Sequence, residues 1–364
     1  MTVQQFSPTE ASPIPTKSTA GTRHNFPLDM WYVAALSNEL TDKPLGRTLL
    51  NEPVVLFRTA DGTVNALEDR CCHRFLPLSA GTLEDNGVRC GYHGLLFNGD
   101  GKVIEIPGQE KVPSRAKVQR YVVKEQDALI WIWFGNEVNS EPTCEPPHYP
   151  VHNNTDYHYS GDVFHYNAPY QLVHDNLLDL SHLGYVHLKT IGGNASIHMN
   201  AQMDVTQDGN SVKVVRHMLN STPPPTYSAA YPFSGKIDRW QEIVFHPSHL
   251  EIWTGAVEQG SEPVDSPDRG GFHMRGFHGL TPETDESCFY LWTMASNPTQ
   301  NVEDTMKKVF DQTAFTFDED KLVIEAQYEN MKRFNGKKMI DIHVDVGANR
   351  ARRIIESLKQ GEIA

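Results

Sequence analysis

Two short runs of cysteine and histidine constrain this 364-residue chain more than any other feature. Cys71 and His73 form a C-x-H pair, Cys90 and His93 form a C-x-x-H pair, and residues 74–89 lie between the two. Structural zinc fingers usually carry ligands of one type on each arm. Here each arm offers one thiolate and one imidazole, which suits a cluster with cysteines on one iron and histidines on the other. The spacing therefore predicts a [2Fe–2S] cluster on these four residues.

A second ligand set lies in DNLLDLSHLGYVH, residues 175–187. It supplies two histidines and a nearby carboxylate, which are the ligand types of a mononuclear Fe(II) site that activates O₂. Asp179 and His182 are three residues apart and share one face of a helix. His182 and His187 would be about 140° out of phase on a regular helix, too far apart for one metal. We therefore expect the helix to bulge or end near Gly184.

The composition is that of a globular enzyme with an acidic surface. The net charge of −14, from 46 acidic and 32 basic residues, argues against a nucleic-acid partner. No apolar run approaches the roughly 20 residues that a membrane span needs, and no secretory signal is evident at the N-terminus. Three of the five cysteines remain beyond the cluster and show no disulfide pattern, so we expect a cytoplasmic enzyme.

The chain divides by composition into three parts. Residues 1–25 are rich in Ser, Thr, Pro and Gln and are expected to form a disordered tail. Short β-branched or aromatic runs follow, which predict a small all-β domain. They are RTLLNEPVVLFR, TVNALED, KVQRYVVKEQD and ALIWIWFG. A segment rich in Pro, Glu and His near residues 137–150 marks the domain boundary, and strands with period-two patterning and a terminal helical stretch lie beyond it.

The stretch CCHRFLPLSAGTLEDNGVRCGYHGLLFNGDG resembles the Rieske domain of the non-haem iron aromatic oxygenases, and DNLLDLSHLGYVH resembles their iron-binding motif. With MWYVAALSNELTDKPLGRTLLNEPVVLFR and FDEDKLVIEAQ, the resemblance extends from about Pro27 to about Leu358. It is greatest to the oxygenase components of vanillate O-demethylase and toluenesulfonate methyl-monooxygenase. It implies an α+β fold: an N-terminal all-β Rieske [2Fe–2S] domain at 26–138, then a helix-grip catalytic domain at 139–364. The latter would combine an antiparallel sheet with helices, the last at the C-terminus.

The same resemblance implies a distant third ligand for the mononuclear iron. FDEDKLVIEAQ is similar to a family stretch in which the Asp of an E-D pair is the ligand, and that residue is Asp320. Asp318 is the reserve candidate. Alternatively, Asp318, Glu319 and Asp320 only cap a helix that begins near Lys321, because acidic residues suit a helix N-terminus.

The resemblance also gives Asp179 a role between subunits. It implies that Asp179 links His182 of one subunit to His93 of a neighbour, since a carboxylate that accepts an imidazole N–H fixes the ring. Such a link requires a closed ring of subunits, and the resemblance implies that the ring is a homotrimer. Asn176 is expected to make a polar contact near the iron, whereas His174 and Asp175 are nearby groups that we do not expect to be ligands.

Electrons must come from another protein. The chain has no G-x-G-x-x-G fingerprint for a nicotinamide cofactor, and the remaining cysteines cannot build a second four-cysteine cluster. We therefore expect a terminal oxygenase component served by a separate NAD(P)H-dependent reductase, with or without a ferredoxin.

The resemblance favours methyl hydroxylation or O-demethylation of an aromatic acid. Ring dihydroxylation is the alternative reaction, and a non-catalytic electron-transfer or ligand-binding protein is the alternative class. The substrate itself is not specified by the sequence. Four cations could pair with a substrate carboxylate, although the sequence favours a surface or structural charge for each of them: Lys189, Arg216, Arg239 and Arg275.

Overall fold

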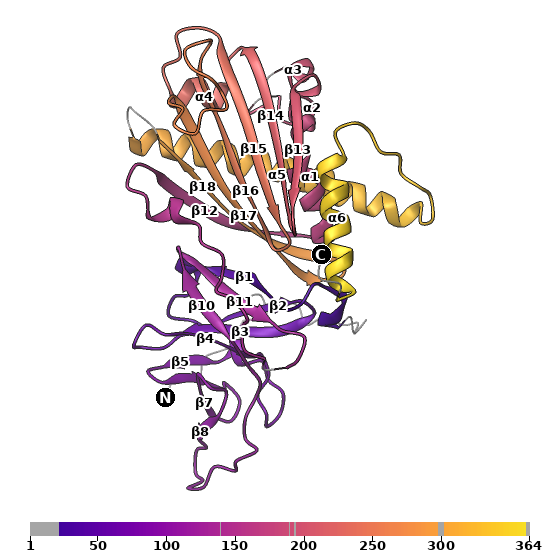
Figure 1. Cartoon of the computed structure of the whole chain (residues 1–364). Coiled ribbons are helices and arrows are strands. Elements are labelled where there is room, and N and C mark those ends of the chain that lie inside the picture. The colour runs from indigo at the N-terminus through magenta and orange to yellow at the C-terminus, as the bar shows by residue number, and fades with distance from the viewer. Residues whose placement is uncertain (1–21, 139, 189, 193, 298–301, 362–364) are drawn as a thin grey trace.

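The computed structural model describes residues 22–138, 140–188, 190–192, 194–297 and 302–361. Antiparallel strands form four sheets, and helices gather on the largest one, which confirms the predicted α+β class (Figure 1). Most of the predicted tail, residues 1–21, lies outside the described residues. Within the rest of that segment Arg23 is buried and lies 3.6 Å from the Glu52 carboxylate.

Strands make up most of the N-terminal part and the large sheet of the C-terminal part. In chain order the strands are β1 (Met30–Leu36), β2 (Leu45–Leu49), β3 (Glu52–Arg58), β4 (Val64–Glu68), β5 (Thr82–Glu84), β6 (Gly87–Arg89), β7 (Leu96–Asn98), β8 (Val103–Glu105), β9 (Arg120–Tyr121), β10 (Val123–Gln126), β11 (Leu129–Phe134), β12 (His158–Tyr166), β13 (Gln202–Asp208), β14 (Ser211–Ser221), β15 (Ile237–His246), β16 (His249–Glu258), β17 (Phe272–Thr284) and β18 (Ser287–Ser296). The α-helices are α1 (Tyr170–Leu178), α2 (Leu183–Val186), α3 (Ala195–Met199), α4 (Pro225–Ala230), α5 (Val302–Arg333) and α6 (Val346–Lys359).

The N-terminal part consists of three small sheets with strand orders β1-β11-β10, β2-β3-β4-β9 and β5-β6-β7-β8. Strand β11 reads LIWIWF and is buried at every position, because both of its faces are covered. The run RTLLNEPVVLFR contains two strands, β2 and β3, rather than one. They are joined at Leu50 and Asn51, whose φ values of 50° and 64° match the twist of a two-residue hairpin.

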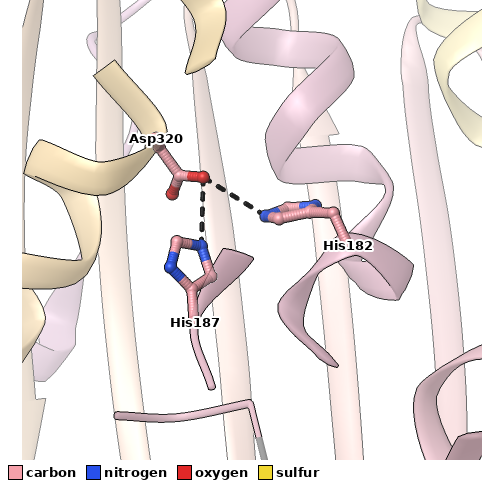
Figure 2. Close-up of side chains that lie close together, drawn as sticks. All are labelled: His182, His187 and Asp320. Carbon is pink, nitrogen blue, oxygen red and sulfur yellow. Dashed lines mark hydrogen bonds and ion pairs between the residues drawn. The ribbon is translucent and has the colours of Figure 1, made fainter. Parts of the chain in front are cut away.

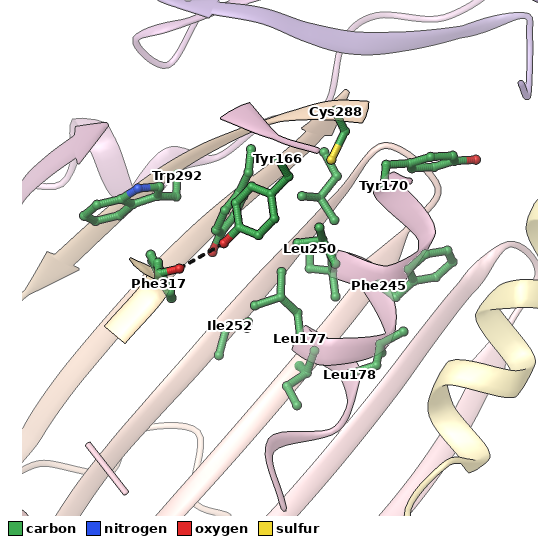
Figure 3. Packing of buried hydrophobic residues seen from close by; sticks show 14 of the residues in the cluster. Tyr166, Tyr170, Leu177, Leu178, Phe245, Leu250, Ile252, Cys288, Trp292 and Phe317 are labelled. Atoms are coloured by element: carbon green, nitrogen blue, oxygen red, sulfur yellow. Dashed lines mark hydrogen bonds between the residues drawn. The ribbon is translucent and has the colours of Figure 1, made fainter. Parts of the chain in front are cut away.

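The C-terminal part is built on one seven-stranded antiparallel sheet of order β12-β18-β17-β16-β15-β14-β13. Helix α1 packs on it, and α5 crosses behind it in the view of Figure 1. Aromatic and aliphatic side chains fill the space between the sheet and these helices, among them Tyr166, Leu177, Trp292 and Phe317 (Figure 3). The Tyr166 hydroxyl donates to the Phe317 carbonyl at 3.1 Å, which ties the sheet edge to α5.

The two parts meet where β1 and β11 pack against β17 and β18. The Thr281 hydroxyl donates to the Val33 carbonyl at 2.7 Å, and the rings of Trp131 and Phe277 meet edge to face. As a result β5, β7 and β8 lie at the end of the molecule away from α2 and α3 (Figure 1).

Among the described residues, no helix combines the length and the apolar character needed to cross a membrane.

Candidate active site

The predicted iron motif lies on a broken helical segment. Helix α1 ends at Leu178, and Asp179 is extended, with φ −119° and ψ 92°. A 3₁₀ turn at Leu180–His182 and the short helix α2 follow, and His187 terminates α2 with φ −108° and ψ 41°. The helix therefore ends at Val186, close to Gly184 as expected, and a second break that the sequence did not predict lies at Asp179.

Gly184 has a packing role instead. It is buried inside α2, and a Cβ at this position would lie 2.2 Å from the Cα of Ala195 in α3. The lack of a side chain thus lets α2 and α3 approach closely.

His182, His187 and Asp320 come together as the second motif requires. One carboxylate oxygen of Asp320 lies 3.3 Å from Nε2 of His182 and 3.0 Å from Nε2 of His187 (Figure 2). The three ligand atoms lie within 4.8 Å of one another. Two imidazoles and one carboxylate that converge in this way form the donor set of a facial-triad Fe(II) site.

Asp320 reaches this cluster from the middle of α5. The residues that α5 buries recur every three or four positions, and Asp320 lies on this stripe between Phe317 and Ile324. The alternative that these acidic residues cap a helix beginning near Lys321 is wrong, because α5 starts at Val302. Asp318 is exposed and does not belong to the cluster.

Opposing electrostatic effects act on Asp320. Burial raises the pKa of its carboxyl group, but hydrogen bonds and charges from His182 and His187 outweigh this and lower it to about 2. The Asp320 carboxylate is therefore ionised at neutral pH and can act as an anionic ligand.

Hydrogen bonds orient both histidines. Nδ1 of His187 lies 2.9 Å from the Glu319 carboxylate, and Nδ1 of His182 lies 2.6 Å from the main-chain carbonyl of Asp179. Each acceptor holds the proton on Nδ1, so Nε2 faces the centre of the cluster. Asn176 donates to the central Asp320 oxygen at 3.0 Å, which is the expected polar contact.

The Asp179 side chain is engaged locally in this single chain. Its carboxylate accepts from the Ser181 amide at 2.9 Å and from the Ser181 hydroxyl at 3.0 Å. Within one subunit, the contact from Asp179 to His182 is thus made by the backbone carbonyl rather than by the carboxylate.

His182, His187 and Asp320 line a cavity between the sheet, α1 and α5. Most of its wall is apolar, with contributions from Leu177, Ile252, Met274, Met294 and Phe317. A mainly apolar cavity with a few converging polar groups is typical of small-molecule sites.

The four predicted cluster ligands lie on two loops with matching backbone bonds. The amide of Cys71 donates to the Leu76 carbonyl at 2.8 Å, and the amide of Cys90 donates to the Leu95 carbonyl at 2.9 Å. The fifth residue of each loop is left-handed: Phe75 has φ 62° and Gly94 has φ 75°. The two loops therefore present their side chains in nearly the same way.

These loops bring the two residue types together in pairs. Cys71 and Cys90 are buried, and burial together with the neighbouring Cys90 thiol raises the pKa of Cys71 to about 11. The rings of His73 and His93 are exposed, with centroids 4.5 Å apart. Buried thiols beneath exposed imidazoles fit a cluster whose histidine-bound iron lies nearer the surface.

Several other sequence candidates have structural partners. His174 is buried between Tyr170 and Phe245, and burial lowers its pKa to about 3. Asp175 pairs with Arg352 of α6. The guanidinium of Arg275 lies 3.6 Å from the Trp253 ring, and Lys189 lies outside the described residues.

Sequence reasoning did not assign the orienting role of Glu319 or the cavity position of Gln241. Glu319 precedes Asp320 in an acidic run, so only the fold separates their roles. Gln241 is two residues from Arg239 on β15, and residues with this spacing point to the same face of a strand, which is a detectable signal.

Comparison with known families agrees with this geometry. Residues 30–119 match the Rieske [2Fe-2S] domain, and residues 166–360 match the vanillate O-demethylase oxygenase C-terminal domain. The resemblance drawn from the sequence motifs is thereby confirmed.

Full-length relatives and solved structures extend the match. The chain is 35% identical to the toluene-4-sulfonate monooxygenase system iron-sulfur subunit TsaM1 of Comamonas testosteroni, over 91% of this chain and 96% of the relative. It is 34% identical to the vanillate O-demethylase oxygenase subunit of Pseudomonas sp. (strain HR199 / DSM 7063), over 93% and 96%. The structure of dicamba monooxygenase bound to 3,6 dichlorosalicylic acid aligns with a TM-score of 0.84 at 32% identity, over 91% of this chain and 97% of that one.

Another structure of dicamba monooxygenase, with non-heme iron and dicamba, aligns with a TM-score of 0.72 at 31% identity over 91% of this chain and 96% of that one. The cofactors predicted from the sequence, a [2Fe–2S] Rieske cluster and a mononuclear iron, are those of this group. The prediction of an oxygenase component is confirmed in the same way. The chain belongs to the Rieske non-haem iron oxygenases, in the family of the vanillate O-demethylase oxygenase component.

Proposed function

We propose that this oxygenase component hydroxylates a methyl or methoxy carbon of an aromatic acid. The observation that supports this best is the position of His182, His187 and Asp320 on the wall of an apolar cavity. The reaction balances as R–CH₃ + O₂ + 2 e⁻ + 2 H⁺ giving R–CH₂OH + H₂O. From a methoxy group, the resulting hemiacetal would release formaldehyde and leave a phenol.

We assign roles to the residues as follows. Cys71, His73, Cys90 and His93 would hold the cluster, and His182, His187 and Asp320 would hold the mononuclear iron. When bound, these groups supply single electrons and reductive activation of O₂. The chain itself orients the histidines through Glu319 and the Asp179 carbonyl. The apolar wall formed by Leu177, Ile252 and Met294 limits the water that can reach the reacting carbon.

The electrons would come from a separate NAD(P)H-dependent reductase, directly or through a ferredoxin. Relatives of this chain are components of multicomponent oxygenase systems, which supports the need for a second protein that supplies the electrons. We place the oxygenase and its reductase in the cytoplasm, where the three cysteines beyond the cluster, Cys72, Cys144 and Cys288, would stay reduced.

We further propose that the working enzyme is a cyclic homotrimer in which Asp179 of one subunit faces His93 of the next. Exposed apolar side chains flank both ends of this link. Phe75 and Tyr92, next to the cluster histidines, are 66% and 64% exposed, and Tyr185, beside the iron motif, is 65% exposed. Large apolar groups at two separate surfaces suit a head-to-tail interface, which closes into a ring.

The activity is tested by reconstitution. Iron-loaded protein with a surrogate reductase should oxidise NADH only when a methyl- or methoxy-substituted aromatic acid is present. It should form the benzylic alcohol, or formaldehyde and the phenol. The same protein should show the electron paramagnetic signal of a reduced Rieske cluster. Arene cis-dihydrodiols as the products would favour ring dihydroxylation, and a colourless protein that binds only zinc would reject the oxygenase assignment.

A further inference from the structure

The cavity has a second polar region, on the sheet side. Arg239 and Gln241 of β15 and Thr254 of β16 line it together with Tyr227 of α4. Gln241 and Thr254 are direct cross-strand partners, and the Tyr227 hydroxyl donates to Thr254 at 3.1 Å. The cavity therefore has polar groups in two places, at His182, His187 and Asp320 and at this second region. Residues such as Ile252 contribute an apolar wall.

Arg239 is the charged member of this region, and few of its donors are used. Its side chain is 3% exposed. One hydrogen bond is found for it, from Nη2 to the Ile191 carbonyl at 3.3 Å, and its buried Nε has no partner among the described residues. The guanidinium lies 4.8 Å from the centroid of the Tyr227 ring, which holds it in place without neutralising its charge.

The fold pairs a comparable arginine with a carboxylate but leaves Arg239 without one. Arg269 is also buried, and it forms an ion pair with Glu242 of β15. In the part of the chain that the structure describes, neither Arg239 nor its neighbour Arg216 has an ion-pair partner. A buried charge is costly unless it is paired, so an unpaired guanidinium on a cavity wall indicates an anion that binds there.

Arg216 determines which way the Gln241 amide points. It is buried, its Nη2 donates to the His198 carbonyl, and its Nη1 donates to Oε1 of Gln241 at 3.2 Å. Because a guanidinium can only donate, the oxygen of Gln241 must face Arg216. The Gln241 NH₂ group then remains as a donor beside Arg239, so the region offers N–H groups from two side chains.

We propose that Arg239 and Gln241 form an anion-binding site for the carboxylate or sulfonate of the aromatic substrate. This inference rests on the proposed function, because it uses the same cavity. The anion would bind at the sheet-side region, the ring would pack on the apolar wall, and the carbon to be oxidised would lie beside His182, His187 and Asp320. Planar N–H donors match the oxygens of either anion, and a bidentate pair with a carboxylate is the strongest case.

Calorimetric binding to the iron-loaded enzyme without O₂ tests the site. The anions are 4-methoxybenzoate and 4-methylbenzenesulfonate, and the neutral comparisons are 4-methoxybenzamide and 4-methylbenzenesulfonamide. The wild type should bind at least one anion about 10-fold or more tightly than the matching neutral compound. Arg239→Gln should weaken the binding of that anion by about 30-fold or more and change the binding of the neutral compound little, since a charge-assisted hydrogen bond is lost. Arg239→Lys should recover part of the loss.

Arg275→Gln is the matched control, because this arginine stacks on Trp253 and is not among the residues that line the cavity. It should leave the preference for the anion intact. Equal binding of anions and neutral compounds by the wild type would overturn the site without reference to any variant. If Arg239→Gln lowers the affinity for the anion and for the neutral compound equally, Arg239 has only a structural role. If the anions bind but no substrate drives NADH oxidation, the anion site is supported and the proposed function is rejected. If only neutral substrates are oxidised, the oxygenase activity is supported and the anion site is rejected.

Discussion

His187 has a carboxylate at each ring nitrogen. Asp320 lies 3.0 Å from Nε2, and Glu319 lies 2.9 Å from Nδ1. Neighbouring residues on a helix point about 100° apart, so two adjacent side chains of α5 can contact opposite sides of one buried ring. At the residue scale, the proposed iron site thus depends on a pair of acidic residues with different tasks: one for the metal and one for the histidine.

Asp320→Ala should remove the mononuclear iron and abolish turnover while the Rieske spectrum persists. The two sites use separate residues, so total iron should fall by about one third. Metal analysis and visible spectroscopy on the same sample would measure both. Asp318→Ala is the matched control, since Asp318 is exposed and only two residues away on α5. Full iron content and activity in Asp320→Ala would show that the third ligand is another residue.

Glu319→Ala should weaken iron binding by about 10–100-fold without emptying the cluster, because His187 would lose the acceptor that orients it. Competition with a chelator would give the iron affinity. Glu319→Gln should restore part of it, as its amide oxygen still accepts a hydrogen bond. Glu329→Ala, which removes an exposed partner of Lys332 on the same helix, should have no effect. If the iron affinity of Glu319→Ala is unchanged, Glu319 does not orient His187 for metal binding.

At the scale of elements, the iron motif depends on how short helices pack. Between the end of α1 and His187, the chain passes through an extended residue, a 3₁₀ turn and one turn of α-helix. None of these pieces is stable alone, since isolated short helices are marginal in water. Contacts with α3, especially at Gly184, must therefore hold His182 and His187 in place.

Gly184→Ala should destabilise the protein by about 1–3 kcal/mol, because the added methyl group would overlap the backbone of Ala195 and the cost of overpacking exceeds the gain in helix propensity. Thermal unfolding would measure the loss, and iron analysis should show lower mononuclear occupancy. Gly235→Ala is the control, since a Cβ there would meet nothing within 4 Å. A melting temperature at or above that of the wild type would mean that α2 and α3 can separate at little cost.

At the scale of the whole molecule, the cluster loops and the mononuclear site occupy different ends of one chain (Figure 1). The exposed rings of His73 and His93 and the half-buried Asp179 each lie near exposed aromatic residues. A head-to-tail trimer would bring the two surfaces together and give each cluster a nearby iron on the next subunit.

Asp179→Asn should leave both metal sites filled but slow electron transfer between them, because the amide keeps the shape and loses the charge. In rapid-mixing experiments, the reduced cluster of this variant should fail to reoxidise at the normal rate when substrate and O₂ arrive. Sedimentation of the same sample should still give a trimer. Normal reoxidation in the variant, or in a monomeric protein, would reject transfer between subunits through this residue.

Local patterns carried much of the prediction. The spacings of Cys71 with His73 and of Cys90 with His93 indicated a cluster, since ligands on one loop are close in sequence as well as in space. The alternation of apolar residues indicated strands such as β14 and β16 for the same reason. The α+β class and the oxygenase family followed from these patterns together with the resemblance.

Tertiary structure decided what depends on long-range packing. The resemblance named Asp320 as the third ligand with Asp318 in reserve, and the packing of α5 on α1 places Asp320 at His187 and Asp318 at the surface. The helix end near Gly184 followed from the spacing of His182 and His187, but the second break, at Asp179, was visible only in the folded chain. In the sequence Arg239 was one of four cations that could pair with a substrate carboxylate. In the folded chain it is buried on the cavity wall without a carboxylate partner among the described residues. Burial and pairing are properties of the folded chain, because they depend on residues that are distant in sequence.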